Sequence, residues 1–240
     1  MKKLFDNTVY LDFFTDNPNM HQYFPISQSR NYLPLWWKDI PSPKASYDRM
    51  RSMKRCSGFM DFFKNTYTVP LWSEILVDIK NHDYYIEATD GSINSNDIKI
   101  SHPPQQRKGF LAEPMFSHIK VPVNWRVESN KSLDIIVIPP TWINDPTFVN
   151  KINVLSASKN PSYDMSMHWH FMLNKETDCT FTIEPDTPMY HFVPITDKKV
   201  VVRTHYDPEK YGRMNNYPLI NNFGFNSSFY KMKRFLDKST

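Results

Sequence analysis

The sequence predicts a mainly β domain of the jelly-roll or β-sandwich kind, with a few short helices and one helix at its C-terminal end. Short segments rich in β-branched and aromatic residues succeed one another from residue 68 to residue 206. No helical period interrupts them between residues 130 and 206, whereas a parallel sheet needs crossover helices between its strands. Aromatic residues form 15% of the 240 residues, and their large apolar area is enough for one sizeable core.

The first 45 residues are expected to form an irregular arm that packs on the body. They are rich in Pro, Asn and aromatic residues, include the adjacent Trp36 and Trp37, and contain a short helix near residues 35–38. Residues 46–240 are expected to form one β-rich domain. A helix over residues 57–65 belongs to it, because a capping Ser57 precedes Phe and Met residues that share one face.

Nine segments of the body are predicted to be strands, since they alternate in polarity or are apolar runs bounded by turn residues. They are residues 68–79, 83–89, 97–100, 132–140, 154–158, 165–173, 179–184, 189–195 and 199–206. Asp90 and Gly91 are typical of a hairpin turn after the second segment. The tail from Asn226 is predicted to be a helix, because its apolar residues recur at helical spacing.

Composition excludes several function classes. Only five glycines are present, and none forms the Gly-rich phosphate loop of a nucleotide-binding fold. Cys56 and Cys179 are too few for a disulfide framework and lack metal-ligand spacing. The net charge of +4 is mild, so nucleic acid is not the favoured partner. No signal peptide or membrane-spanning run is recognisable, so a cytoplasmic location without a membrane partner is expected.

A pair of histidines in one predicted strand is the sharpest chemical feature. His168 and His170 are two residues apart, so both imidazoles project from the same face of a strand. With Glu176 and His191 they would suit a mononuclear Fe, Mn, Ni, Co or Zn site in a jelly roll. This set is similar to the cupin pattern, although the cupin glycines are missing. The alternative is that these histidines face solvent or satisfy hydrogen bonds in the core.

Two further catalytic candidates are incomplete. Cys56 follows two basic residues and precedes the predicted helix, a setting typical of reactive thiols, but no base can be paired with it. His205 and Asp207 have the spacing of an iron-binding pair in 2-oxoglutarate oxygenases, but no later histidine follows them. A strand end and turn is the simpler interpretation of that segment.

Six motifs, in their order along the chain, resemble a family of uncharacterised proteins of tailed phages, notably phages of marine bacteria, with relatives in bacteria. They cover roughly residues 30–200 and are LWW at 35–37, MKRC at 53–56 leading into FMDFFKN at 59–65, VPLWS at 69–73, NWRV at 124–127, MHWHF at 167–171 and DTPMYHFVP at 186–194. The resemblance implies a phage-type protein of the infected cell's cytoplasm or of the virion. It implies no activity and no site residues.

Three functions follow as hypotheses. The first is a non-catalytic structural or accessory protein, which binds a protein partner or associates with itself through aromatic residues such as Trp36 and Trp37. The second is a jelly-roll enzyme, an oxygenase or isomerase, that uses the histidine site. The third is a carbohydrate- or peptide-binding module. The first is favoured, because no catalytic set in the sequence is complete.

Overall fold

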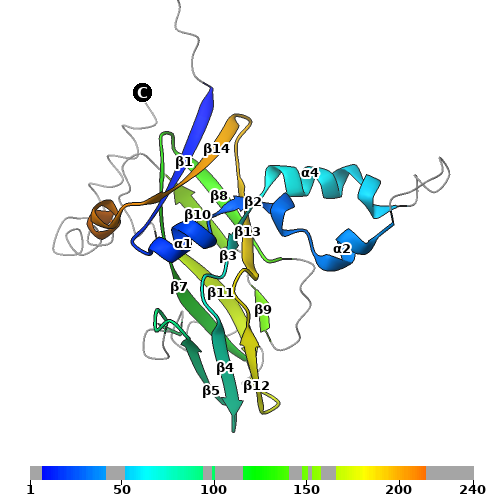
Figure 1. Cartoon of the computed structure of the whole chain (residues 1–240), viewed down its shortest axis with the longest axis vertical. Coiled ribbons are helices and arrows are strands. Elements are labelled where there is room, and N and C mark those ends of the chain that lie inside the picture. Colours follow the sequence, from blue (N-terminus) through cyan, green and yellow to red (C-terminus); the bar gives the residue numbers. More distant parts are fainter. Residues whose placement is uncertain are drawn as a thin grey trace, which may run out of the picture.

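The protein is a layered β structure from which a helical arm projects (Figure 1). The computed structural model describes residues 7–41, 52–93, 99–100, 116–140, 148–150, 153–157 and 166–214. The β-rich, sandwich-like fold expected from the sequence is confirmed. Among the described residues, strands form three sheets, and all but one of the paired strands are antiparallel.

The largest sheet, sheet A, contains the first and the last strands that the structure describes. Its order is β14-β1-β7-β11-β9, and β6 also pairs with β7. The bounds are β14 (Lys199–Tyr206), β1 (Thr8–Thr15), β7 (Phe116–Ser129), β11 (Ser166–Asn174), β9 (Phe148–Asn150) and β6 (Lys99–Ile100). β1 and β14 are the parallel pair, with Thr8 opposite Lys199 and Thr15 opposite Tyr206.

The second sheet, sheet B, faces sheet A across the core. It has the order β10-β8-β13-β3-β2. Its strands are β10 (Asn153–Ala157), β8 (Leu133–Ile138), β13 (Pro188–Pro194), β3 (Tyr67–Pro70) and β2 (Ser27–Gln28). Phe13 from sheet A meets Phe192 from sheet B with ring centroids 5.5 Å apart, and both side chains are fully buried.

The third sheet, sheet C, extends sheet B away from the body. It contains β12 (Cys179–Ile183), β4 (Ile75–Lys80) and β5 (Asp83–Ala88). Leu71 accepts a backbone hydrogen bond from Asp186 and donates one to Thr187, and these bonds link the β3–β13 pair to the β4–β12 pair. The resulting two-stranded ribbon bends at this point, where Asp186 has a φ of +67°.

Short helices surround the sheets. They are α1 (Pro18–Tyr23), η1 (Ser29–Tyr32), α2 (Leu35–Asp39), η2 (Met53–Arg55), α4 (Ser57–Asn65) and a last helical segment over residues 208–214. The helices expected near residues 35–38 and over 57–65 are confirmed as α2 and α4, although the cap position of α4 is Cys56, not Ser57. Among the described helices, none has the length and apolar character that crossing a bilayer requires.

No helix is predicted from the sequence over residues 208–214, but Asp207 starts one there. Its carboxylate accepts a hydrogen bond from the Lys210 backbone amide at 2.8 Å, and its carbonyl accepts one from Tyr211 at 2.9 Å. This capping role satisfies amides that the first helical turn would otherwise leave unpaired. The helix predicted from Asn226 lies outside the described residues.

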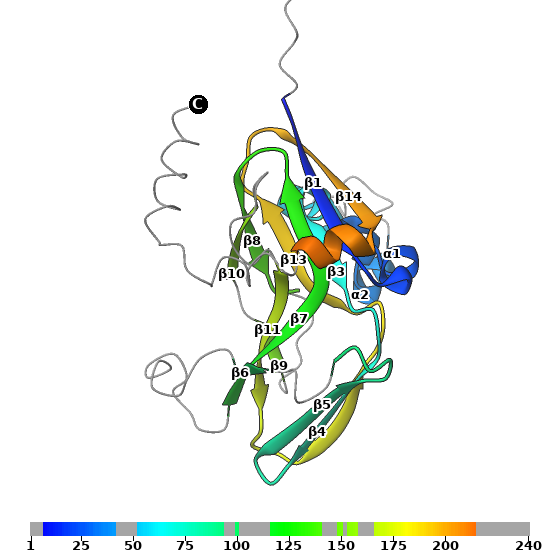
Figure 2. The ribbon, with the colours of Figure 1, turned by 90° about the vertical axis from the view of Figure 1, so that its left-hand side faces the viewer.

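Four described strands were not expected: the short β2 and β9, and the longer β1 and β7. β1 occupies residues 8–15 of the predicted irregular arm, where Val9, Leu11 and Phe13 alternate with polar residues and enter the core. β7, the longest strand, runs from its pairing with β1 to its pairing with β6 (Figure 2). Its odd-numbered residues from 117 to 129 are all buried, an alternation that predicts a strand with one face in the core.

The other strand predictions needed smaller corrections. The segment 68–79 is two strands in different sheets, β3 and β4, separated by the bend of the ribbon. The hairpin that β5 forms turns at Asn81 and His82, which have φ of +54° and +64°, rather than at Asp90 and Gly91. Positive φ at both central residues matches the twist of the flanking strands, which explains the tight turn between β4 and β5.

Candidate functional site

The arm formed by α2, η2 and α4 stands clear of the sheets (Figure 1). Aromatic side chains hold its two helices together. Trp37 of α2 is 4% exposed and stacks on Phe59 of α4, with ring centroids 5.2 Å apart. Phe63 meets Trp37 edge-on at 5.8 Å. Such aromatic pairs contribute beyond the area they bury, so the arm has a small core of its own.

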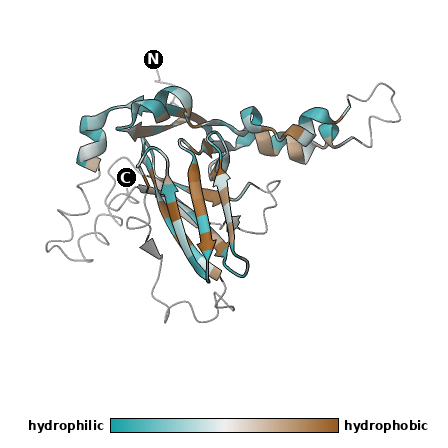
Figure 3. Cartoon of the chain, turned by 60° about the horizontal axis from the view of Figure 1, so that its bottom comes forward, coloured by the Kyte–Doolittle hydropathy of each residue, from teal (hydrophilic) through white to brown (hydrophobic). Residues whose placement is uncertain are grey.

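The arm also exposes large apolar side chains. Leu35 is 75% exposed, Met60 49%, Met53 42% and Trp36 41%. Figure 3 shows apolar segments on the arm although no sheet lies against its outer part. Single exposed apolar residues are ordinary on protein surfaces, but four on one short projection form a candidate contact surface. Trp36 and Trp37 therefore have different positions: Trp37 supports the arm from inside, and Trp36 is accessible.

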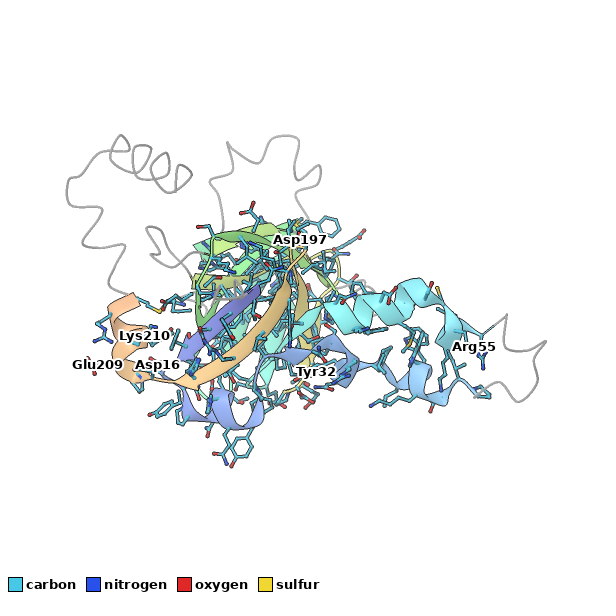
Figure 4. All side chains as sticks on the ribbon, turned by 90° about the horizontal axis from the view of Figure 1, so that it is seen from above. Asp16, Tyr32, Arg55, Asp197, Glu209 and Lys210 are labelled. Carbon is cyan, nitrogen blue, oxygen red and sulfur yellow. The ribbon has the colours of Figure 1, made fainter. Side chains whose placement is uncertain are left out.

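The arm is basic. Its described residues, 35–41 and 52–65, contain four Lys and Arg against two Asp, a formal surplus of +2. Lys38, Arg55 and Lys64 are exposed, and Arg55 lies toward the outer end of the arm (Figure 4). The surface that presents the apolar side chains therefore carries positive charge beside them.

A buried polar cluster holds the base of the arm on sheet B. Phe192 faces sheet A, so the neighbouring His191 projects from the opposite face of sheet B. Its Nδ1 lies 2.7 Å from Thr68 Oγ1 of β3 and 3.0 Å from Ser29 Oγ of η1. Thr68 Oγ1 donates to Ser29 Oγ at 2.9 Å. All three side chains are fully buried.

Apolar packing completes this anchor. Phe62 of α4 meets the His191 ring edge-on, with centroids 5.7 Å apart. Burial lowers the pKa of His191 to about 3, because the apolar surroundings disfavour the charged imidazolium. The imidazole is therefore neutral at neutral pH and serves as a hydrogen-bonding core residue. This is one of the two alternatives that the sequence left open for it.

Tyr32 provides a second anchor for η1. Its hydroxyl is hydrogen-bonded to Asp186, the residue at the bend of the ribbon, and to Ser27. Burial and the neighbouring Asp186 carboxylate raise the pKa of Tyr32, since both disfavour the phenolate. Figure 4 shows Tyr32 near the base of the arm. The arm thus leaves the body from a segment fixed at both of its ends.

The structure separates the four residues considered as metal ligands. His168 and His170 lie side by side on the outer face of sheet A, with ring centroids 6.0 Å apart. His191 is in sheet B, and Glu176 is exposed in the turn after β11. Among the described residues, no group of three or more His, Cys, Asp or Glu side chains could hold a metal ion.

Sequence reasoning missed a third histidine near the pair. His118 of β7 is 7% exposed, and its ring centroid lies 5.4 Å from that of His170. The register of β7 against β11 places it diagonally across from His170, on the same face of the sheet. The alternation of β7 would have revealed this neighbour, because residues 118 and 120 must face away from the core.

The remaining candidates have structural roles. Cys56 is exposed on the arm, with no catalytic base paired to it within the described residues. His205 Nε2 is 2.8 Å from Asp12 Oδ1 in the neighbouring strand, and its ring stacks on Phe14. Asp207 caps the last described helix. His205 and Asp207 therefore do not act as a pair.

Comparison of the chain with protein-family models, curated proteins and solved structures finds no match.

Proposed function

We propose that this protein is a non-catalytic structural or accessory protein that binds a protein partner through the arm formed by α2, η2 and α4. The family resemblance in the sequence supports a phage-type protein, and with it a role in the infected cell or in the virion. The observation that carries the proposal is the exposure of Trp36 and Leu35 on a projection that is rigidly held. Accessible aromatic residues of this kind dominate many protein–protein contacts.

The construction of the arm supports binding. Trp37, Phe59 and Phe63 fix the two helices against each other, so the exposed residues are presented in one arrangement before a partner arrives. Such pre-organisation lowers the entropy lost on association. The Ser29–Thr68–His191 cluster likewise fixes the base of the arm on sheet B before a partner arrives. A flexible arm of the same composition would lose more freedom in forming the same contacts.

The test uses the exposed Cys56 as an attachment point. A Cys179→Ser protein is labelled at Cys56 with a photoreactive crosslinker, added to lysate of infected cells and to disrupted virions, and irradiated. We expect a discrete crosslinked protein that is strongly reduced by Leu35→Ser with Trp36→Ala. The control is Tyr206→Ala, which removes a side chain that is 49% exposed on sheet A. Equal crosslinking by the arm variant and the wild type would refute the proposal.

A further inference from the structure

The exposed outer face of sheet C is acidic, whereas the arm is basic. Sheet C and its turns, residues 74–90 and 175–186, are called the wing here. They contain nine Asp and Glu against two Lys, although the whole chain carries +4. The wing therefore concentrates the acidic charge of the protein, and its surplus of seven exceeds the opposite surplus of the arm.

The outer face of the wing also offers apolar contact. Alternation along β4 and β5 directs Ile75, Val77 and Ile86 into the core, and it directs Leu76 and Tyr85 outward. Tyr85 is 43% exposed, and its hydroxyl donates to Glu87 at 2.6 Å. Leu76 pairs with Glu87 on one side and with Thr182 on the other. Leu76 thus lies among acidic and polar neighbours.

The arm and the wing lie at different ends of the molecule (Figure 1). The arm leaves beside β2, whereas the wing extends away from the body beyond the bend at Asp186. Two surfaces held apart in this way cannot meet within one chain while both anchors are intact. Complementary charge steers association and selects partners, and the exposed apolar residues supply contact area once the surfaces meet.

We propose that the partner of the arm is a second copy of this chain, and that the arm docks on the outer face of the wing. The inference rests on the proposed function of the arm and names its occupant. Leu35, Trp36, Met53 and Met60 of one copy meet Leu76 and Tyr85 of the next, with Lys and Arg against Asp and Glu around them. Because two different surfaces meet, copies join head to tail, in a closed ring or in an open chain.

Charge reversal with cross-rescue tests the inference. One variant carries Lys38→Glu and Arg55→Glu in the arm, and another carries Glu87→Lys and Glu184→Lys in the wing. All four positions are at or near the surface, and circular dichroism checks that each variant is folded. A control, Lys198→Glu with Lys199→Glu, makes the charge change of the arm variant at the start of β14, where both residues are exposed. Self-association is measured by sedimentation velocity over a range of protein concentrations.

Wild type and control are expected to form larger species with increasing concentration. Raising the salt from about 0.1 M to about 1 M, which shortens the Debye length from about 10 to about 3 Å, should weaken this association. Each variant alone should associate at least about tenfold more weakly, because its substituted side chains then face side chains of the same charge across the contact. An equimolar mixture of the two variants should associate again, since the two acidic substitutions on the arm of one variant then face the two basic substitutions on the wing of the other.

Wild-type protein that remains monomeric at low salt would overturn the inference, and so would a mixture that fails to regain association. The crosslinking experiment distinguishes failure of this inference from failure of the proposed function. If Cys56 on the arm captures a different protein in an arm-dependent way, the arm is a binding element and only the identity of its occupant is wrong. If it captures nothing in an arm-dependent way, both proposals fail.

Discussion

Acidification should destabilise the protein through the buried imidazole that joins the arm to sheet B. His191 has a folded pKa of about 3, whereas an unfolded histidine has a pKa of about 6.5. Between these values the unfolded chain binds a proton that the folded chain excludes, so stability falls as the pH falls. From pH 7 to pH 5 the loss is about 2 kcal/mol, a roughly thirtyfold change in the unfolding equilibrium.

The perturbation that isolates this effect is His191→Gln. Glutamine can donate to or accept from the Thr68 and Ser29 hydroxyls but does not titrate, so the variant should lose the part of the pH dependence that comes from protonation of His191. Urea unfolding, followed by tryptophan fluorescence at pH 7, 6 and 5, gives the free energy of unfolding of each protein. For each protein, the free energy of unfolding at pH 5 is subtracted from that at pH 7. Any loss of stability that the substitution causes equally at both pH values cancels in this difference.

Wild type should lose about 2 kcal/mol more than His191→Gln over this range. His21→Gln serves as the control, because it removes a partly exposed histidine of α1 that is not in the anchor. Identical pH dependence in wild type and His191→Gln would show that the imidazole is not desolvated, and the buried anchor would then be incorrect. If His21→Gln reduces the pH dependence of stability as much as His191→Gln does, the effect is not specific to the buried His191.

Two further substitutions test other parts of the fold. Asp12→Asn weakens the two bonds from Arg203, at 2.6 and 2.7 Å, and the one from His205. Burial raises the pKa of Asp12, but these partners outweigh burial and lower the pKa overall. The ionised carboxylate therefore stabilises the folded protein at pH values above the unfolded pKa of about 4, and this stabilisation is lost as the pH falls. We expect a loss of at most about 1 kcal/mol at pH 7, vanishing in acid, by urea unfolding. Tyr190→Phe removes a buried hydroxyl that has no hydrogen-bond partner among the described residues, so thermal unfolding should show unchanged or higher stability. A clear decrease would mean that the hydroxyl is satisfied.

Most strands of the sheets can be predicted from the sequence, because short apolar or alternating segments follow one another in the second half of the chain. β1 was obscured by the Pro- and Asn-rich residues that follow it, which made its neighbourhood look irregular. β7 contains Pro122 and several polar residues, although each of its odd-numbered residues from 117 to 129 is buried. Periodicity within a segment is local and can be read from the chain, but composition over a longer window can hide it.

The histidines show what local patterns do not contain. The shared face of His168 and His170 followed from their spacing, and the structure places them together. That His191 lies in a different sheet, and that His118 lies beside His170, depends on strand order and register. These are set by pairing between distant segments and by packing of the core, and a single sequence does not specify them directly. The wing could not be predicted for the same reason, because its acidic residues come from two segments that are distant in the sequence.

The parallel pairing of β1 with β14 has a consequence for how the chain is made. β1 is synthesised before both of its neighbours in sheet A, which come from residues 116–129 and 199–206. Nearly two hundred residues must therefore be synthesised before both edges of β1 are paired. Contacts of such long sequence separation slow folding, and an unpaired strand invites wrong pairing meanwhile. Chains interrupted before residue 199 leave β1 with one open edge, which makes them substrates for chaperones or proteases.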